Sequence, residues 1–251
     1  MMRYLKIPFR LAYKIYFLTL FFASLAIAYP FFSFLLAKEE RWPRAFYWMQ
    51  KWGTLLRYAS GIFIRYKSKK QFPEPPYVVV SNHGSYIDTV LMYCIIPDYF
   101  VFMGKGELKD WPLFKIFFTK GMNILVDRSN IRASHRAYQR AHEELSKKRS
   151  VTIFPEGGIP ATAPKLDRFK NGAFRLAIEH QVPIVPITLV NSWSAFNSNE
   201  LYCGEGGPDV IRVVVHKAIS TKGLTDKDLI HLRQQAHDVI NKPLLEDESR
   251  R

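Results

Sequence analysis

The chain has 251 residues, of which 48% are hydrophobic and 15% aromatic, and its formal net charge is +14. This composition excludes a disordered chain, and the length suffices for one domain with its own core, with or without an appendage. The two cysteines, Cys94 and Cys203, exclude a disulfide framework and a four-cysteine zinc site. The positive charge favours an anionic partner, which can be a nucleic acid, an acidic membrane surface or a negatively charged substrate.

A long apolar segment lies near the N-terminus. The residues from Ile15 to Ala37 carry no charge and are numerous enough to cross the hydrocarbon core of a bilayer. Four basic residues precede the segment: Arg3, Lys6, Arg10 and Lys14. Together with the sequence Ala-Ile-Ala at 26–28, which resembles a cleavage site, they resemble a secretory signal peptide. The apolar run continues to Leu36, however, which favours a helix that is retained.

A second segment, Trp42 to Ile64, mixes tryptophan and tyrosine with basic residues, a pattern that suits the headgroup region of a membrane. Basic residues lie on both sides of the first segment, so the positive-inside signal is weak. We therefore expect residues 1–64 to form a two-helix membrane anchor in one leaflet, with a kink at Pro30. A full span followed by an ordinary surface helix is the alternative.

Residues 65–251 are expected to form an α/β domain. Short runs rich in β-branched residues predict strands at 62–66, 77–80, 100–102, 124–126, 151–154, 184–190 and 211–215. Helical patterns lie between them, most clearly at 130–148, where Ile131 starts an apolar stripe, and again at 226–241. This alternation predicts a layered mixed sheet flanked by helices. Pro186 inside a predicted strand indicates an edge position or an irregular end.

Polar residues with chemical potential follow the predicted strand at 77–80, in the sequence NHGSYID at 82–88. His83 and Asp88 can meet only if His83 lies in a turn and Asp88 in the first turn of the next helix, because five helical residues separate two side chains by about 140°. An aspartate bonded to one imidazole nitrogen leaves the other nitrogen as a general base. Alternatively, His83 caps the helix and Asp88 favours its positive end.

Two further motifs follow predicted strands. In FPEGG, at 154–158, the proline and two glycines indicate a tight turn that holds Glu156 at the end of the sheet, where a carboxylate can be structural or functional. In GMNILVDR, at 121–128, Arg128 can be a surface charge or can bind a phosphate through two donors.

The order NHGSYID, GMNILVDR, FPEGG and VPIVP over residues 82–186, together with FKNGAF at 169–174, resembles the glycerolipid acyltransferase family, in particular the lysophosphatidic acid acyltransferases. The resemblance covers most of residues 62–220, and an N-terminal two-helix membrane element is also a family feature. It implies an enzyme that moves a fatty acyl group from a thioester to the free hydroxyl of lysophosphatidic acid, making phosphatidic acid.

The resemblance also implies site roles. His83 would remove the acceptor's proton and Asp88 would support the imidazolium, so that no acyl-enzyme is needed. Glu156 and Gly157 match the acceptor-binding block, and Lys105 and Arg128 match positions associated with the acceptor phosphate. No metal or other cofactor is implied, and the donor would be acyl-CoA or an acyl carrier protein.

One position departs from the family pattern. The block that contains Glu156 usually continues with threonine and arginine, but here Gly158 and Ile159 occupy those positions. Lys105, Arg128, Arg168 or Lys170 would then have to replace the missing arginine, or the acceptor is another lyso-lipid, such as a lyso-aminolipid. Lysophosphatidate remains the favoured acceptor.

Other classes of protein explain less. A serine hydrolase needs G-x-S-x-G, which the sequence lacks, and a nucleic-acid partner leaves the uncharged segment unexplained. A catalytically inactive membrane-binding relative remains an alternative. Because thioester donors are made inside the cell, we expect the protein on the inner membrane or another cytoplasm-facing membrane, with residues 65–251 on the cytoplasmic side and against anionic lipids.

Overall fold

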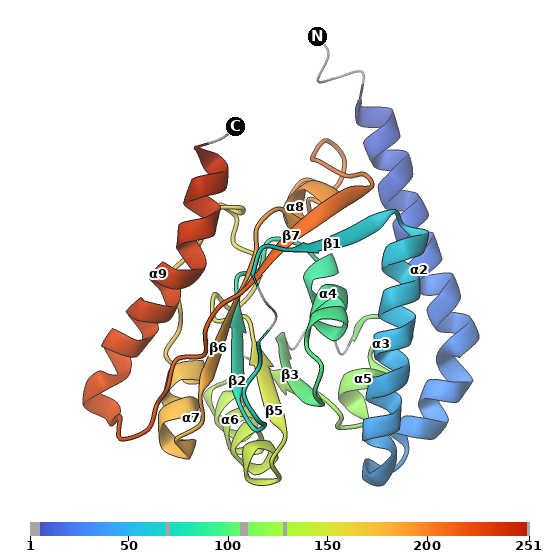
Figure 1. Ribbon diagram of the computed structural model, residues 1–251. Coiled ribbons are helices and arrows are strands. Elements are labelled where there is room, and N and C mark those ends of the chain that lie inside the picture. Colours follow the sequence, from blue (N-terminus) through green and yellow to red (C-terminus); the bar gives the residue numbers. More distant parts are fainter. Residues whose placement is uncertain (1–5, 69–70, 106–109, 128–129, 250–251) are drawn as a thin grey trace.

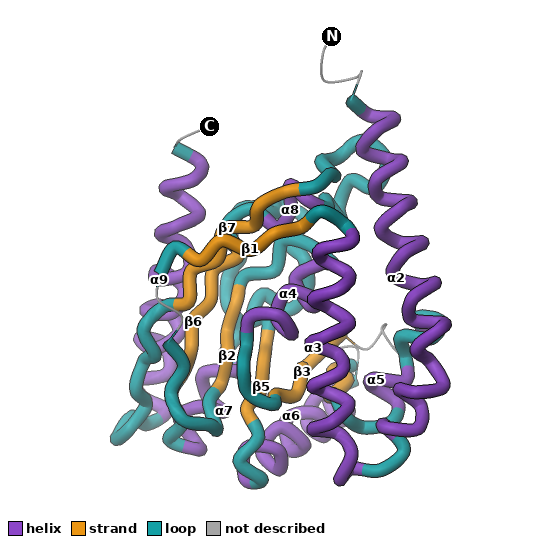
Figure 2. Tube along the Cα trace, turned by 45° about the vertical axis from the view of Figure 1, so that its right-hand side comes forward, coloured by secondary structure: helices purple, strands orange, loops and turns teal. Residues whose placement is uncertain are grey.

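The computed structural model describes residues 6–68, 71–105, 110–127 and 130–249, with the backbone but not the side chain of Lys105. These residues form a seven-stranded sheet in the order β1-β7-β6-β2-β5-β3-β4 (Figures 1 and 2). Its strands are β1 (Ile62–Tyr66), β2 (Val78–Ser81), β3 (Phe100–Lys105), β4 (Ile124–Val126), β5 (Ser150–Ile153), β6 (Ile184–Leu189) and β7 (Asp209–Val215).

Helices cover both faces of this sheet. They are α2 (Ile7–Leu36), α3 (Trp42–Ala59), α4 (Ile87–Ile95), α5 (Ile116–Thr119), α6 (Ile131–Ser146), α7 (Gly172–His180), α8 (Ser192–Ala195) and α9 (Leu229–Glu248). In β2, Val79 packs with residues of α2, α3, α4 and α5, while Val78 and Val80 pack with α6, α7 and α9 on the opposite face. All three valines are fully buried, as expected for a strand covered on both sides.

The predicted layered mixed sheet is confirmed, and each predicted strand run overlaps one strand of the structure. The paired strands run parallel to one another except β6 and β7, which are antiparallel. Of the two alternatives for Pro186, an edge position or an irregular end, the edge position is excluded, because β6 lies between β7 and β2. Pro186 instead marks the end of the β6–β7 ladder, where its carbonyl accepts from the N–H of His216 and its missing N–H forfeits one bond.

The apolar stripe predicted for α6 is buried at its C-terminal end but not at its start. Asn130 caps the helix by accepting the N–H of Ala133, and Ala141 and Leu145 are buried against the sheet. Ile131 was expected in the same stripe but is 88% exposed. It lies in the first helical turn, beyond the end of β4, where the sheet no longer provides a surface to bury it.

The two N-terminal helices pack against the α/β domain along their length. In α2, Phe17 packs against Phe196 in a tilted arrangement and Phe32 packs edge-on against Phe117, with ring centroids 5.4 and 5.1 Å apart. The helix continues through residues 26–28 and through Pro30 to Leu36. Strand β1 then follows α3 directly and crosses the expected domain boundary at residue 64.

The tryptophan-rich pattern of the second segment proves to have two uses. Trp42 and Phe46 of α3, expected at a lipid headgroup surface, are buried, and Phe46 packs 5.1 Å from Phe100. Trp48 and Tyr58 remain about half exposed. An amphipathic helix buries its apolar side wherever an apolar surface is available, and here the sheet supplies one.

Candidate active site

The predicted reactive loops meet where the chain leaves the sheet toward opposite faces. Strands β2 and β5 are parallel neighbours. The helix that follows β2, α4, packs in one hydrophobic layer, whereas the helix that follows β5, α7, packs in the other. The loops after these two strands therefore diverge at the carboxyl ends of the strands, which is where open α/β sheets place their ligands.

His83 and Asp88 form a hydrogen-bonded pair at this end of the sheet. The Nδ1 atom of His83 lies 2.9 Å from Oδ2 of Asp88. His83 is in the loop after β2, and Asp88 is the second residue of α4, as the spacing requires. The same Oδ2 accepts the N–H groups of Gly84 and Ser85, each at 2.8 Å, and the side chain of Asp88 is fully buried. Because Oδ2 already accepts two N–H groups, we infer that it also accepts from a protonated Nδ1, which leaves Nε2 of the imidazole as an acceptor.

The turn after β5 packs against His83 and hydrogen-bonds to its backbone. Phe154 stacks on the imidazole, with ring centroids 4.1 Å apart. Glu156 is 8% exposed, and its Oε1 accepts the backbone N–H of His83 at 2.7 Å while Oε2 accepts the N–H of Asp167 at 3.0 Å. Burial raises the pKa of the Glu156 carboxyl to about 7, although both hydrogen bonds oppose the shift. Glu156 thus joins the His83 loop to the loop before α7.

Further hydrogen bonds fix the ends of the His83 loop. The side chain of Asn82 forms two bonds with the backbone of Leu189 in β6, one in each direction, at 3.0 and 2.9 Å. The hydroxyl of Ser85 donates to the carbonyl of Phe196 at 2.6 Å, and the N–H of Tyr86 donates to the hydroxyl of Ser198 at 2.9 Å. The imidazole is therefore attached to a rigid frame, with 14% of its side chain exposed.

The remaining predicted site residues fall into two groups. Gly157 follows Glu156 with φ of 93°, a left-handed conformation that glycine adopts without strain. Lys170 has an exposed side chain, and its N–H donates to the carbonyl of Pro155 at 2.9 Å, so it lies at the base of the Glu156 loop. The side chain of Lys105, at the end of β3, and all of Arg128 lie outside the described residues.

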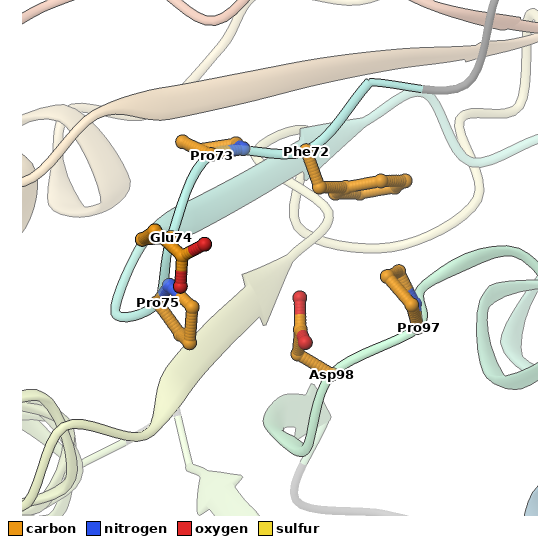
Figure 3. Close-up of a pocket in the computed structure, with 6 residues that line it drawn as sticks. All are labelled: Phe72, Pro73, Glu74, Pro75, Pro97 and Asp98. Carbon is orange, nitrogen blue, oxygen red and sulfur yellow. The ribbon is translucent and has the colours of Figure 1, made fainter.

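The structure also contains two open cavities away from His83. One, of about 420 Å³, is lined by residues that precede β2 and β3, among them Phe72, Glu74 and Asp98 (Figure 3). It therefore lies at the end of β2 opposite the His83 loop. The other, of about 430 Å³, lies between β4 and α6 and is lined in part by Arg136 and Arg140.

Several supporting residues could not be predicted as such from the sequence. Phe154 belongs to the FPEGG motif, but nothing in the sequence indicates that its ring stacks on the imidazole of His83, which follows a different strand. Ser198 and Phe196 lie more than a hundred residues beyond the turn that they hold, and no local pattern marks them.

Comparison with known proteins adds the following findings. The sequence profile of the Acyltransferase family matches residues 63–190. The chain is 32% identical over 175 residues to the 1-acyl-sn-glycerol-3-phosphate acyltransferase alpha of Mus musculus, covering 69% of this chain and 60% of the mouse protein. It is 27% identical over 194 residues to the 1-acyl-sn-glycerol-3-phosphate acyltransferase of Saccharomyces cerevisiae, covering 76% and 63%. The chain thus spans about three fifths of the length of these curated relatives.

The solved structures contain a similar fold. The crystal structure of the 1-acyl-sn-glycerophosphate acyltransferase PlsC from Thermotoga maritima superposes with a TM-score of 0.74 over 98% of both chains, at 18% sequence identity. This likeness extends to the two N-terminal helices as well as the sheet. Since the family profile covers the strands and loops that carry His83, Asp88, Glu156 and Gly157, the chain belongs to the acyltransferase family.

Proposed function

We propose that this protein transfers a fatty acyl group from an acyl thioester to the free hydroxyl of lysophosphatidic acid, making phosphatidic acid. The observation that carries the proposal is the 2.9 Å contact between His83 Nδ1 and the buried Asp88 carboxylate. Such a contact orients an imidazole as a general base. Membership of the acyltransferase family and the names of the mouse and yeast relatives support the choice of reaction and acceptor.

In the proposed reaction, Nε2 of His83 accepts the proton of the acceptor hydroxyl as its oxygen attacks the thioester carbonyl. The new C–O bond forms, the C–S bond breaks, and the thiolate leaves with the proton from the imidazolium. Asp88 stabilises the transient positive charge on the ring. The backbone hydrogen bonds of the turn hold the imidazole in place, so little reorganisation is needed when the substrates bind.

Charge complementarity supports phosphate-bearing substrates. Both proposed donors, acyl-CoA and acyl carrier protein, are anionic, and the chain carries a net charge of +14. Lys170 at the base of the Glu156 loop, and by family resemblance Lys105 and Arg128, would bind the acceptor phosphate. Gly158 and Ile159 leave this loop without the usual arginine. This departure favours another lyso-lipid, such as a lyso-aminolipid, as the second candidate acceptor.

We further propose that α2 and α3 bind one leaflet of a membrane without crossing it. Helix α2 is long and apolar enough to span a bilayer. However, one side of it is packed on the α/β domain, and a true span would carry that domain into the hydrocarbon. Its opposite side presents Ile27, Phe31 and Phe34, which are 84, 42 and 59% exposed. A surface of this kind is suited to burial at the level of the headgroups and upper acyl chains.

The test of the function is acyl transfer by the purified full-length protein in lipid nanodiscs, with acyl-CoA and acyl carrier protein as donors. Lysophosphatidate and a neutral or zwitterionic lyso-aminolipid serve as acceptors, and products are identified by mass spectrometry. Preferential formation of phosphatidate supports the proposal. Faster acylation of the lyso-aminolipid would contradict the choice of acceptor, and no thioester consumption with any pair would contradict the enzyme itself.

A further inference from the structure

The loop between α8 and β7, residues 196–206, contains none of the residues assigned to the proposed reaction, yet it is an ordered element. The side chain of Asn197 accepts the N–H groups of Asn199 and Glu200 at 3.0 and 3.1 Å, and the N–H of Gly204 donates to the carbonyl of Glu200 at 2.9 Å. These bonds turn several backbone carbonyls toward α2, which lies beside the loop in Figure 1.

Lys14 of α2 occupies this arrangement of carbonyls. Its Nζ atom donates to the carbonyl oxygens of Glu200, Leu201 and Gly204 at 2.7, 3.1 and 3.1 Å. An ammonium group has three hydrogens, so all of its donors are used. Nζ also lies 5.8 Å from the centre of the Phe196 ring, in range of a cation–π attraction.

The position of Lys14 is unusual for a lysine. The residue is 2% exposed and immediately precedes the uncharged segment of α2. Burial lowers the pKa of its ammonium group, and a buried charge is tolerated only when its hydrogen bonds are satisfied. A Cβ on Gly206 would lie 2.9 Å from Cε of Lys14, so a glycine at that position leaves room for the side chain. One turn earlier, Arg10 donates to Glu205 at 2.6 Å.

From its opposite side the loop holds the proposed active site. The carbonyl of Phe196 accepts the Ser85 hydroxyl, and the hydroxyl of Ser198 accepts the Tyr86 N–H, at 2.6 and 2.9 Å. The side chain of Asn199 donates to the carbonyl of Pro160 at 2.7 Å. The loop therefore bonds both to the turn between His83 and Asp88 and to the loop that continues from Glu156.

We propose that Lys14 is a positioning residue for acyl transfer, which fixes the 196–206 loop and through it the turn that carries His83. The proposal rests on the proposed function of His83, and it assigns to α2 a role in the geometry of the site besides membrane attachment. The path begins and ends with direct hydrogen bonds, from Lys14 to the carbonyls of the loop and from Phe196 and Ser198 to Ser85 and Tyr86. Between them it follows the backbone of the loop, which the side chain of Asn197 braces.

The first test compares Lys14→Met with Lys6→Met in the full-length protein. Lys6 is the N-cap residue of the same helix and is exposed, so its substitution controls for the loss of one charge near the membrane. We expect Lys14→Met to lower kcat by about tenfold or more, since small displacements of catalytic groups have effects of this size. We also expect faster hydrogen exchange in residues 84–86 and 197–204 with unchanged exchange in β2 and β5. Wild-type kcat and exchange in Lys14→Met would overturn the proposal.

A second test does not depend on whether Lys14→Met folds. Ser198→Ala removes the bond to the Tyr86 N–H without altering α2, and Lys14→Arg keeps a cation with several donors. We expect Ser198→Ala to accelerate hydrogen exchange at residues 84–86. The double variant Lys14→Met/Ser198→Ala should lose less activity than the two single effects combined. Lys14→Arg should retain part of the kcat that Lys14→Met loses. Fully additive losses, or exchange that rises equally throughout the sheet, would show that Lys14 only stabilises the fold. Because exchange requires no turnover, it still tests the contacts if the wild type transfers no acyl group, a result that would refute the proposed function instead.

Discussion

The phenyl ring of Phe154 lies parallel to the imidazole of His83, with an angle of 10° between the two planes. The two residues follow adjacent strands, β2 and β5, so the stacking restricts how far the imidazole can rotate about the contact with Asp88. Phe154→Leu keeps an apolar side chain but removes the flat surface. We expect kcat to fall by about tenfold with a loss in stability of about 1–2 kcal/mol.

A matched control for this variant is Phe169→Leu. Phe169 is also buried and stacks on Phe174 with an interplanar angle of 16°, but it packs in the layer of α7 and α9. The two variants should lose similar stability in urea titrations, and only Phe154→Leu should lose kcat. Equal kcat values for the two would refute an orienting role for Phe154.

The second prediction concerns the histidine–aspartate pair. His83→Ala should lower kcat by at least about 10²-fold, the usual contribution of a general base, while the protein still folds and binds the membrane. Asp88→Asn retains an oxygen for the N–H groups of Gly84 and Ser85 but can hold the ring in the wrong tautomer, so we expect a severe loss of rate with the fold preserved. His135→Ala, at an exposed position of α6, provides the control. Wild-type rates in either pair variant would rule out the proposed base.

The third prediction follows from the burial of Glu156. Because burial raises the pKa of this carboxyl from 4.5 to about 7, the folded protein binds the proton more tightly than the unfolded chain. This contribution to stability is therefore present at low pH and is lost as the pH rises from about 4.5 to about 7, by about 3 kcal/mol in total. Glu156→Gln is neutral throughout and should lose this slope.

The slope can be measured by urea unfolding in micelles at about pH 5 and about pH 8. The exposed Glu40→Gln should behave as the wild type, with the same difference in the free energy of unfolding between the two pH values. A Glu156→Gln variant that retains the wild-type slope would show that another group produces the pH dependence.

The fourth prediction concerns the exposed apolar side of α2. Replacing Ile27, Phe31 and Phe34 together by serine should strongly weaken binding to vesicles, because each such side chain contributes about 1.5–3 kcal/mol when removed from water. The far-ultraviolet circular dichroism should not change. The control replaces Ile230 and Leu245 of α9, which are 65 and 55% exposed. If both sets of substitutions weaken vesicle binding equally, α2 does not form the membrane surface.

The fifth prediction concerns truncation. Deleting residues 1–59 removes many of the side chains that cover one face of the sheet, including Phe46, which packs against Tyr93, Tyr99 and Phe100. We expect the remaining chain to aggregate or to require detergent even in high salt. A soluble, monomeric fragment with a cooperative thermal transition would show that the α/β domain does not need the two helices.

The sequence predicts the strands well because most of them are short runs of β-branched or other apolar residues, a composition that itself indicates a buried strand. It predicts the meeting of His83 and Asp88 for a similar reason, since a short segment and one glycine suffice to bring them together. The pairing of Lys14 with residues 200–204 is beyond such reasoning. In the sequence this lysine is one of four basic residues before an apolar run, and only the folded chain places carbonyls around it.

The sequence does not decide between two structures where a local pattern has two physical solutions. A proline within a strand is tolerated either at a sheet edge or where one ladder ends, and Pro186 takes the second. An aromatic, amphipathic helix can bury its apolar side in lipid or in protein, and Trp42 and Phe46 are buried in protein. In each case the deciding contact comes from a distant part of the chain.

The pairing of β1 with β7 has a consequence for how the protein is made. Ile62 and Asp209 are partners in the sheet. Strand β1, which follows the N-terminal helices, therefore cannot pair until the chain has been synthesised as far as β7. Contacts so distant in sequence form late, and the apolar sides of the early helices stay uncovered meanwhile. Early contact of α2 with a lipid surface during synthesis would shield those residues from aggregation until β7 closes the sheet.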